Sequence, residues 1–288
     1  MNHKILVVGA TGNVGQNLVP LLAEQGETVK AATRNPNQYQ TDYTQVEPVF
    51  FDYDQPELFA ELLADVDRLF MLALPADPLT IARLIPLVDA AKAANVQHIV
   101  MMTAIGVDQA EGAPLYEVEK YIEASGVAYT FLRPNWFMDN FSTGFIQPMI
   151  AEARGIFVPA EDAKTSFIAT EDIAAVAAVV LTETGHRGKG YTLTGNEAMS
   201  YSEAAQILSE VTGQTINYVP ISDADLRQNM SAAGLGAEEV DYFSMLFQFV
   251  RAGYTEAIDT AVSLILQREP ITLKAFATKT PILPVQVA

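Results

Sequence analysis

The stretch GATGNVG, from Gly9 to Gly15, is the first part of the sequence whose residue types and spacing could do chemistry. It follows the apolar run KILVVGA and precedes a run in which Val14, Leu18 and Leu22 recur at helical spacing. A glycine-rich turn between a strand and a helix lets backbone N–H groups approach a pyrophosphate at the positive end of the helix. The sequence therefore predicts a nucleotide-binding loop here, with a tight turn that holds no ligand as the alternative.

The end of the next predicted strand indicates which dinucleotide such a loop would hold. An acidic side chain there accepts the ribose hydroxyls of NAD, whereas the 2′-phosphate of NADP needs a cation. No Asp or Glu occurs from Thr28 to Gln40, and Arg34 lies about twenty residues after the glycines, in the segment AATRNP. We predict NADP(H) as the cofactor, with Arg34 on the phosphate and Thr33 and Asn35 as further donors. The alternative is an arginine that is merely solvated in a loop.

Tyr116 and Lys120, in the segment YEVEK, are four residues apart and would share one face of a helix. A tyrosine that donates a proton and a lysine that lowers its pKa could together reduce a carbonyl group. However, Leu115, Val118 and Ile122 form the apolar stripe of this helix, and Tyr116 and Lys120 project away from that stripe. A catalytic pair and a solvated face both stay open. On the second interpretation, the residues that flank the solvated lysine are Glu117 and Glu119.

Composition narrows the classes of partner. Lys and Arg total 17 against 35 Asp and Glu, so a formal charge of −18 repels nucleic acid and anionic membrane surfaces. The chain has no Cys, and its three histidines lie far apart in sequence, so we expect no metal site. The first apolar run is too short for a signal peptide or a membrane span. We expect a cytoplasmic protein that binds a small-molecule acceptor, and a homodimer is left open.

Short apolar runs alternate with amphipathic segments through the first half of the chain. The strand-like runs are KILVVGA, TVKAATR, VEPVFFD, RLFMLALP, HIVMMTA and AYTFLRPN. The segments with a helical period between them are NVGQNLVPLLAEQG, PELFAELLADV, LTIARLIPLVDAAKAANV and YEVEKYIEASG. Nearly all-apolar strands that alternate with helices predict an α/β fold with a doubly wound parallel sheet.

The second half is punctuated more irregularly by Pro, Gly and charge. TEDIAAVAAVVLTE and GYTLTG are a candidate helix and strand that would complete the sheet. Further helices are expected in YSEAAQILSEVTG, DADLRQNMSAAG and YFSMLFQFVRAGYTEAI, and an extended arm in the tail TKTPILPVQVA. We predict a cofactor-binding domain over 1–140, completed by about 163–196, and a smaller, mainly helical lobe over 141–162 and 197–288.

Four segments share features with a known family: GATGNVG, ATRNP, FFDYD and SGVAYTFLRPNWFMDNF. In these segments the sequence resembles the NmrA-like branch of the atypical short-chain dehydrogenase/reductases. The resemblance runs from the N-terminus to about Thr194, with a weaker match at REPITLKAF. It implies a Rossmann sheet with a small C-terminal lobe, and NAD(P)H-dependent reduction of quinones or dyes. The family also contains regulatory members that bind the dinucleotide without turning it over.

The same resemblance assigns residues to each part of the site. Around the phosphates it places Gly9, Thr11, Gly12, Asn13, Val14 and Gly15, and on the 2′-phosphate it places Arg34. Beside adenine it places Asp52 and Tyr53, along the ribose Ala73, Leu74 and Pro75, and facing the nicotinamide Thr103 and Ala104. At the border of the substrate cleft it places Pro134 and Asn135, next to the cofactor, and Trp136 and Phe137. For Phe137 and Phe141, packing in the core is the preferred alternative.

The sequence departs from its relatives where a proton relay would lie. Aligned with them, the usual Lys or His position falls at Leu115 and the Tyr position at Glu111. Without a relay, the protein would act by positioning a planar conjugated acceptor, a quinone or a dye, against the nicotinamide. We predict that activity, with the acceptor pocket formed by 141–155 and 230–254. The alternatives are an NADP sensor without turnover and a carbonyl reductase that uses the pair Tyr116 and Lys120.

Overall fold

The computed structural model of the protein describes residues 2–283, which divide into two compact units. The first unit contains the residues up to Pro134 together with Thr170–Thr192. The second unit contains Asn135–Ala169 and the residues from Leu193 onward. Each unit has a hydrophobic core of its own.

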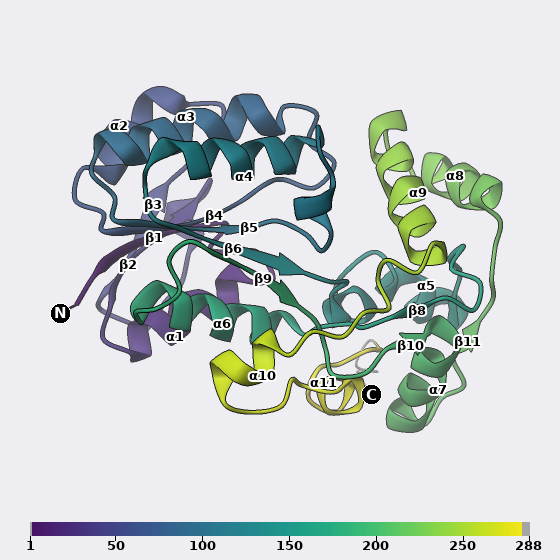
Figure 1. Ribbon diagram of the computed structural model, residues 1–288. Helices are drawn as coiled ribbons and strands as arrows, with labels where there is room; N and C mark the ends of the chain where they lie inside the picture. The colour runs from purple at the N-terminus through teal and green to yellow at the C-terminus, as the bar shows by residue number, and fades with distance from the viewer. Residues whose placement is uncertain (1, 284–288) are drawn as a thin grey trace. The chain divides into compact units, whose positions relative to one another are not determined.

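The first unit is built on a seven-stranded sheet (Figure 1). In spatial order its strands are β3 (Val46–Phe50), β2 (Thr28–Thr33), β1 (Lys4–Val8), β4 (Arg68–Leu72), β5 (His98–Met102), β6 (Tyr129–Pro134) and β9 (Lys189–Leu193). Each neighbouring pair from β3 to β6 is parallel. The chain adds strands on one side of β1 and then on the other, starting with β4. The boundary between β1 and β4 is therefore the switch point, where doubly wound sheets bind their ligands.

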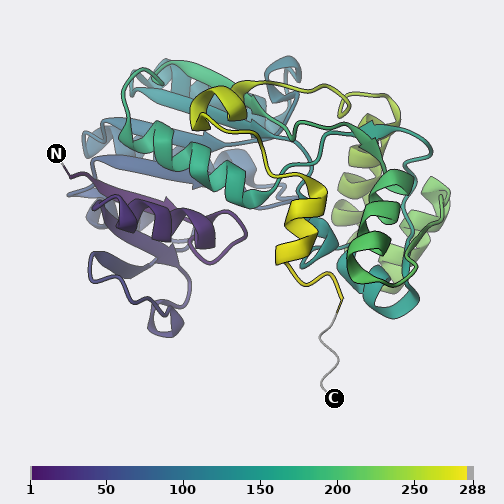
Figure 2. The same ribbon diagram turned by 90° about the horizontal axis from the view of Figure 1, so that it is seen from below.

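Helices cover both faces of this sheet, which explains why its central strands are apolar on both sides. In β1, the residues Ile5–Val8 are all buried. The helices α1 (Gly15–Glu24) and α6 (Thr170–Thr182) lie side by side on one face (Figure 2). The other face is covered by α2 (Phe59–Leu63), α3 (Thr80–Ala93) and α4 (Pro114–Ser125) (Figure 1). The doubly wound α/β fold predicted from the alternating runs is confirmed.

The second unit is mainly helical, as predicted. Its helices are α5 (Gln147–Ala153), α7 (Tyr201–Thr212), α8 (Asp223–Ala232), α9 (Ala237–Arg251), α10 (Ala261–Leu266) and α11 (Leu273–Lys279). Two short strand pairs join them, namely β7 (Gly155–Ile156) with β11 (Asn217–Tyr218) and β8 (Lys164–Thr165) with β10 (Met199–Ser200). Fully buried aromatic rings fill the core of this unit, among them Phe141, Phe167, Tyr201 and Phe247.

The remaining short elements lie in loops of the two units. They are the 3₁₀ turns η1 (Pro36–Gln38), η2 (Pro56–Leu58), η3 (Val107–Gln109) and η4 (Met138–Phe141). Within residues 2–283, no helix combines the length and the apolar character needed to cross a bilayer.

Two expectations for the C-terminal part differ from the structure. The helix expected over 242–258 runs instead from Ala237 to Arg251. It ends there because Gly253 adopts a φ of 81° and donates its N–H to the Val250 carbonyl at 3.0 Å. In the tail expected to be extended, Thr278 and Lys279 belong to α11, and residues 284–288 lie outside the described residues.

Candidate functional site

The loop between β1 and α1 has the geometry of an anion-binding turn. Gly9 adopts a φ of 73°, which favours glycine, and its carbonyl accepts a hydrogen bond from the Gly12 N–H at 2.9 Å. In the described part of the chain, no group accepts a hydrogen bond from the N–H groups of Asn13, Val14 and Gly15. Free N–H groups at the positive end of a helix can bind a phosphate.

Packing of this loop depends most on Gly15. A Cβ atom on Gly15 would lie 2.1 Å from the Gly9 carbonyl oxygen and 2.7 Å from the Ala10 Cα atom. Both neighbours are backbone atoms, so neither can move aside without changing the turn. A Cβ atom on Gly12 would contact only the Gly9 oxygen, at 3.3 Å, and Gly12 is exposed. The glycine at 15 therefore fixes the loop, while the glycine at 12 leaves space above it.

Other residues predicted to bind the cofactor follow the strands of the same sheet. They are Thr33 and Arg34 at the end of β2, Asp52 and Tyr53 after β3, Ala73, Leu74 and Pro75 after β4, Thr103 and Ala104 after β5, and Pro134 at the end of β6. Because β1 to β6 are parallel, the structure brings these segments and the glycine loop to one edge of the sheet. The loop also reaches β4, since a Cβ atom on Gly9 would lie 3.1 Å from the Leu72 side chain.

Arg34 is exposed at this carboxyl edge and is available for a ligand. No ion pair among the described residues involves its guanidinium group. Its neighbour Thr33 is engaged locally, because the Thr33 hydroxyl accepts a hydrogen bond from the Asn35 N–H at 3.3 Å. An unpaired cation at the end of β2 suits a 2′-phosphate, and an acid at this position would not.

The two residues expected beside adenine differ in what they expose. Tyr53 is buried, and its hydroxyl donates to the Leu72 carbonyl at 2.5 Å. Burial raises the pKa of Tyr53 above its usual range, so the phenol stays protonated and holds the ends of β3 and β4 together. Asp52 is half-buried and accepts a hydrogen bond from the Asp54 N–H at 3.0 Å. Any contact of Tyr53 with adenine is therefore limited to the small part of it that remains exposed.

A buried ion pair holds the residue that follows β5. The hydroxyl of Thr103 donates to Glu119 Oε1 at 2.8 Å. Arg133, on β6, donates to the two oxygens of the same carboxylate at 3.1 and 2.6 Å. Glu119 is only 1% exposed, so this bidentate pair lies in a medium that strengthens it. The Thr103 hydroxyl is thus oriented by α4 and β6.

This pair was not predicted from the sequence, where Glu119 was named only as a neighbour of a solvated Lys120; the structure buries its carboxylate. A signal was present, because Leu115, Val118, Glu119 and Ile122 have the i, i+3, i+4, i+7 spacing of one buried stripe. The stripe itself was predicted, and Val118 and Ile122 are fully buried. A carboxylate at a stripe position needs a buried partner, and Arg133 in the segment LRP supplies it.

Tyr116 and Lys120 lie near each other, but not as a proton-donating pair requires. The Lys120 ammonium lies 5.3 Å from the centre of the Tyr116 ring. It bonds to Glu123 at 2.9 Å, and this hydrogen bond raises the pKa of Lys120. Lys120 is exposed and Tyr116 is half-buried. The lysine charge is therefore directed to a carboxylate and to a ring face, in a cation–π contact.

The last predicted site residues belong to the second unit. Asn135 is 2% exposed, and its amide donates to the Ser166 hydroxyl and the Thr255 carbonyl, both at 2.8 Å. Its carboxamide oxygen accepts from the Trp136 N–H at 2.9 Å, so the whole side chain joins segments of this unit. A contact with the cofactor, as predicted for Asn135, would have to come from its backbone.

Trp136 and Phe137 are both half-buried in the same unit. The Trp136 ring centre lies 5.1 Å from that of Phe247 and 6.0 Å from that of Phe145. Phe137 pairs with Ile168 through the backbone. Trp136 is therefore part of an aromatic cluster, which we call the Trp136 cluster and define as Trp136, Phe145, Phe243 and Phe247.

Fold and loop together define the class of this protein, a Rossmann-type α/β protein with a glycine loop at the switch point of its sheet. Across residues 2–283, no three His, Asp or Glu side chains are grouped so that they could hold a metal ion. The family model of the NmrA-like family matches residues 1–276. The chain belongs to this family, which confirms the resemblance found in its four segments.

Relatives with named activities match nearly the whole chain. The NAD(P)H azoreductase of Xenophilus azovorans is 32% identical over 278 residues, which cover 95% of this chain and 96% of the azoreductase. The triphenylmethane reductase of Citrobacter sp., solved with NADP(H), is 28% identical with a TM-score of 0.81, over 96% of this chain and 99% of the reductase. The NADPH-dependent quinone oxidoreductase of Escherichia coli, solved with NADPH, is 25% identical with a TM-score of 0.83, over 96% and 99%.

Proposed function

We propose that this chain is a reductase that passes a hydride from NADPH to a planar conjugated acceptor, such as a quinone or a dye. The coarser statement, an NAD(P)H-dependent oxidoreductase, agrees with the azo, dye and quinone reductases that it resembles. The observation that carries the proposal is the loop at the switch point. There the N–H groups of Asn13, Val14 and Gly15 have no hydrogen-bond acceptor among the described residues.

The residues at the carboxyl edge fit NADP(H). The loop offers N–H donors and a helix end to the pyrophosphate. Arg34 offers a charge-assisted fork to the 2′-phosphate, and no acid between Thr28 and Gln40 competes for it. When bound, the dinucleotide supplies the hydride, and the protein supplies position and orientation.

The chain's own groups favour positioning over proton transfer. The Thr103 hydroxyl donates to Glu119, and the Lys120 ammonium is bonded to Glu123, so neither is set to protonate a substrate. An acceptor whose reduced form is stabilised by conjugation can take its proton from water. In the second unit, the half-buried face of the Trp136 cluster suits stacking against a planar ring. A quinone or a dye meets both conditions.

The test is steady-state oxidation of NADPH by the purified protein with a panel of quinones, azo dyes and triphenylmethane dyes. We expect turnover with at least one class of acceptor. Gly12→Val, whose new side chain would occupy the ligand space at the loop, should abolish turnover and leave the far-ultraviolet circular dichroism near wild type. NADPH binding without oxidation across the whole panel would contradict the proposal and support a dinucleotide sensor. If the Gly12→Val variant still oxidises NADPH, the cofactor does not bind at this loop.

A further inference from the structure

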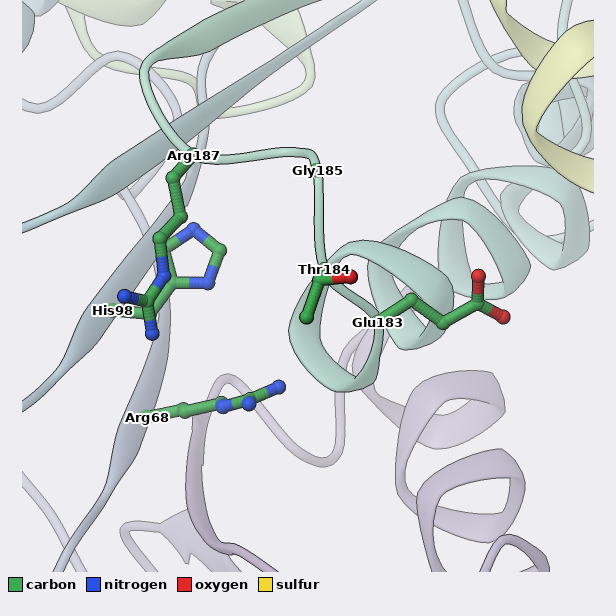
Figure 3. A pocket seen from close by; sticks show the side chains of 6 residues that line it. All are labelled: Arg68, His98, Glu183, Thr184, Gly185 and Arg187. Carbon is green, nitrogen blue, oxygen red and sulfur yellow. The ribbon is translucent and has the colours of Figure 1, made fainter.

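A cavity of about 370 Å³ lies in the first unit at the amino ends of β4 and β5 (Figure 3). It is lined by Arg68, His98, Glu183, Thr184, Gly185 and Arg187. Arg68 begins β4 and His98 begins β5, and the other lining residues connect α6 to β9. The glycine loop follows the opposite, carboxyl end of β1, so the cavity is separate from the proposed cofactor site. Its volume is that of a small-molecule site, roughly 300–1,000 Å³.

Arg68 is a buried cation with open donors. It is 7% exposed, and its Nη2 donates to His3 Nε2 at 2.7 Å. Its Nε and Nη1 atoms are buried and have no hydrogen-bond partner in the described residues. Figure 3 shows the guanidinium tip directed toward the space that the other labelled residues surround. A buried guanidinium with two unsatisfied nitrogens is costly unless a ligand or solvent meets them.

A second guanidinium group stands beside the first. Arg187 is exposed at the cavity and takes part in no ion pair of the described chain. Burial lowers the pKa of Arg68; the charge of Glu27 opposes this, and the charges of Arg187, which lowers it, and Asp67, which raises it, have smaller effects. Arg187 therefore lies within electrostatic reach of Arg68, and an anion bound between them would stabilise both charges.

Among the described residues, no carboxylate forms an ion pair with either arginine, although the charge of Glu27 acts on Arg68. Glu27 reaches Arg68 only through His3, whose Nδ1 lies 3.4 Å from the Glu27 carboxylate. Asp67 bonds to the Lys4 N–H at 2.8 Å. Glu183 lines the cavity, but Figure 3 shows its side chain pointing away from both arginines. The chain as a whole carries a formal charge of −18, whereas the two arginines at this cavity make the local charge positive.

The three histidines of the chain all lie around this cavity, although they are far apart in sequence. His3 accepts from Arg68, His98 lines the cavity, and His186 precedes Arg187. His98 Nε2 lies 2.9 Å from the Thr130 hydroxyl, which donates to the His186 carbonyl at 2.8 Å. Burial, together with Arg187 and Arg68, lowers the pKa of His98 to about 4. Its imidazole is therefore neutral near pH 7 and adds no third charge.

We propose that this cavity binds a phosphate group, held on two sides by the guanidinium groups of Arg68 and Arg187. Guanidinium forks match the oxygen spacing of phosphate, and a bound anion beside Arg68 would offset the cost of burying its charge. The ligand class is inorganic phosphate or a small phosphate monoester. A dinucleotide at the carboxyl edge would leave this cavity accessible, because the two sites lie at opposite ends of the strands.

The histidines provide a direct readout, since all three report on this edge and none lies in the glycine loop. We would follow the imidazole signals by ¹H–¹⁵N NMR at constant ionic strength while adding inorganic phosphate or, in a second arm, glycerol phosphate. Sodium chloride serves as the reference salt. We expect a saturable shift of the His98 signals and a rise in the pKa of His98, because an anion beside an imidazole favours its protonated form. Saturation by the monoester alone would identify an ester as the ligand, and saturation by both would identify the phosphate group itself.

Arg187, just before β9, and Lys189, its first residue, are both exposed cations and give a matched pair of variants. Arg187→Gln should weaken phosphate binding at least about tenfold, the loss expected for one charge-assisted hydrogen bond. Lys189→Gln removes the same charge two residues away, outside the cavity lining, and should change the affinity less than about threefold. Arg68→Gln tests the buried partner, with thermal unfolding as the check that it folds. A shift that never saturates, or equal losses in Arg187→Gln and Lys189→Gln, would overturn the proposal.

Discussion

At the carboxyl edge of the sheet the open donors are backbone N–H groups of Asn13, Val14 and Gly15, whereas at the amino edge they belong to the side chain of Arg68. Both statements hold for the described residues. The carboxyl edge is shaped by glycines and a helix end, and the one cation that we assign to it, Arg34, is exposed. The amino edge is shaped by two arginines and a buried histidine. One sheet thus presents two kinds of anion site.

The two edges differ in what anion binding at each of them depends on. Backbone donors keep their charge distribution at every pH, and they are lost only when the turn changes shape. Side-chain donors depend on the charges around them, so a site made from arginines and a histidine responds to protonation. Four predictions test whether each edge depends on the shape of its backbone or on the charges of its side chains, beginning with the largest expected effect.

Binding of NADPH at the carboxyl edge should be lost when the backbone of the glycine loop is displaced. In Gly15→Ala, the new Cβ atom would lie 2.1 Å from the Gly9 oxygen. We expect NADPH affinity to fall more than about 100-fold and the free energy of unfolding to fall by about 3 kcal/mol. Calorimetric titration and denaturant unfolding measure the two effects. The control is Gly236→Ala, where the nearest atom would be 3.6 Å away. Because Gly236 is the N-cap of α9, the free energy of unfolding should fall there by no more than about 1 kcal/mol, and NADPH affinity should stay near wild type. Equal behaviour of the two variants would show that the loop tolerates a Cβ atom.

The amino edge should make folding stability depend on pH. The pKa of His98 falls from 6.5 to about 4 in the folded protein, so the unfolded chain binds an extra proton between these values. The stabilisation by neutral His98 is therefore complete above about pH 7 and is lost as the pH falls toward 4, by about 3 kcal/mol in total. Denaturant unfolding at several pH values, in phosphate-free buffer, should show a steeper loss in wild type than in His98→Gln. Parallel pH profiles would refute the prediction.

Arg34 should contribute to affinity for one cofactor and not for the other. Replacing Arg34 by Ala should weaken NADPH binding by about 1.5–3 kcal/mol, the scale of hydrogen bonds to a charged group, and leave NADH almost unchanged. Added salt should reduce the difference, because Arg34 is exposed. Titration calorimetry with both cofactors measures the effect. If the variant lost equal binding free energy for NADPH and NADH, Arg34 would not contact the 2′-phosphate.

The smallest effect is expected at Tyr116. Because Lys120 is bonded to Glu123 and lies over the Tyr116 ring, the pair is not arranged to pass a proton from the phenol. Tyr116→Phe should therefore leave kcat for quinone reduction almost unchanged between about pH 6 and 9. A loss of about 100-fold or more with a carbonyl substrate, at unchanged NADPH affinity, would restore carbonyl reduction by Tyr116 and Lys120.

Much of the fold and of the carboxyl edge could be predicted because its signals are local in the sequence. Gly9, Gly12 and Gly15 are separated by short steps, and strand and helix patterns on either side place them. Alternating elements fix the parallel order, and that order brings the ends of β1 to β6 together. The position of Arg34 follows from the end of β2 in the same way.

The amino edge could not be predicted, because its residues come from distant elements. Arg68 and His98 begin the neighbouring strands β4 and β5, and Arg187 precedes β9, which lies beyond β6 at the edge of the sheet. Nothing local in the sequence therefore connects the three histidines with one another. Glu119 is a different case, since its stripe position was visible and its partner Arg133 was not. Side-chain pairing across elements, as in Asn135 with Ser166, also needs the tertiary structure.

Hydrogen-exchange mass spectrometry with saturating NADPH tests most directly whether the cofactor lies at the carboxyl edge. The N–H groups of Asn13, Val14 and Gly15 lack an acceptor in the described chain, so they should exchange rapidly until phosphates bind them. We predict slowed exchange in peptides that cover 11–17 and 33–38, and unchanged exchange at 183–188. Unchanged exchange over 11–17 in protein that calorimetry shows to be saturated with NADPH, or protection centred on 183–188, would contradict the account.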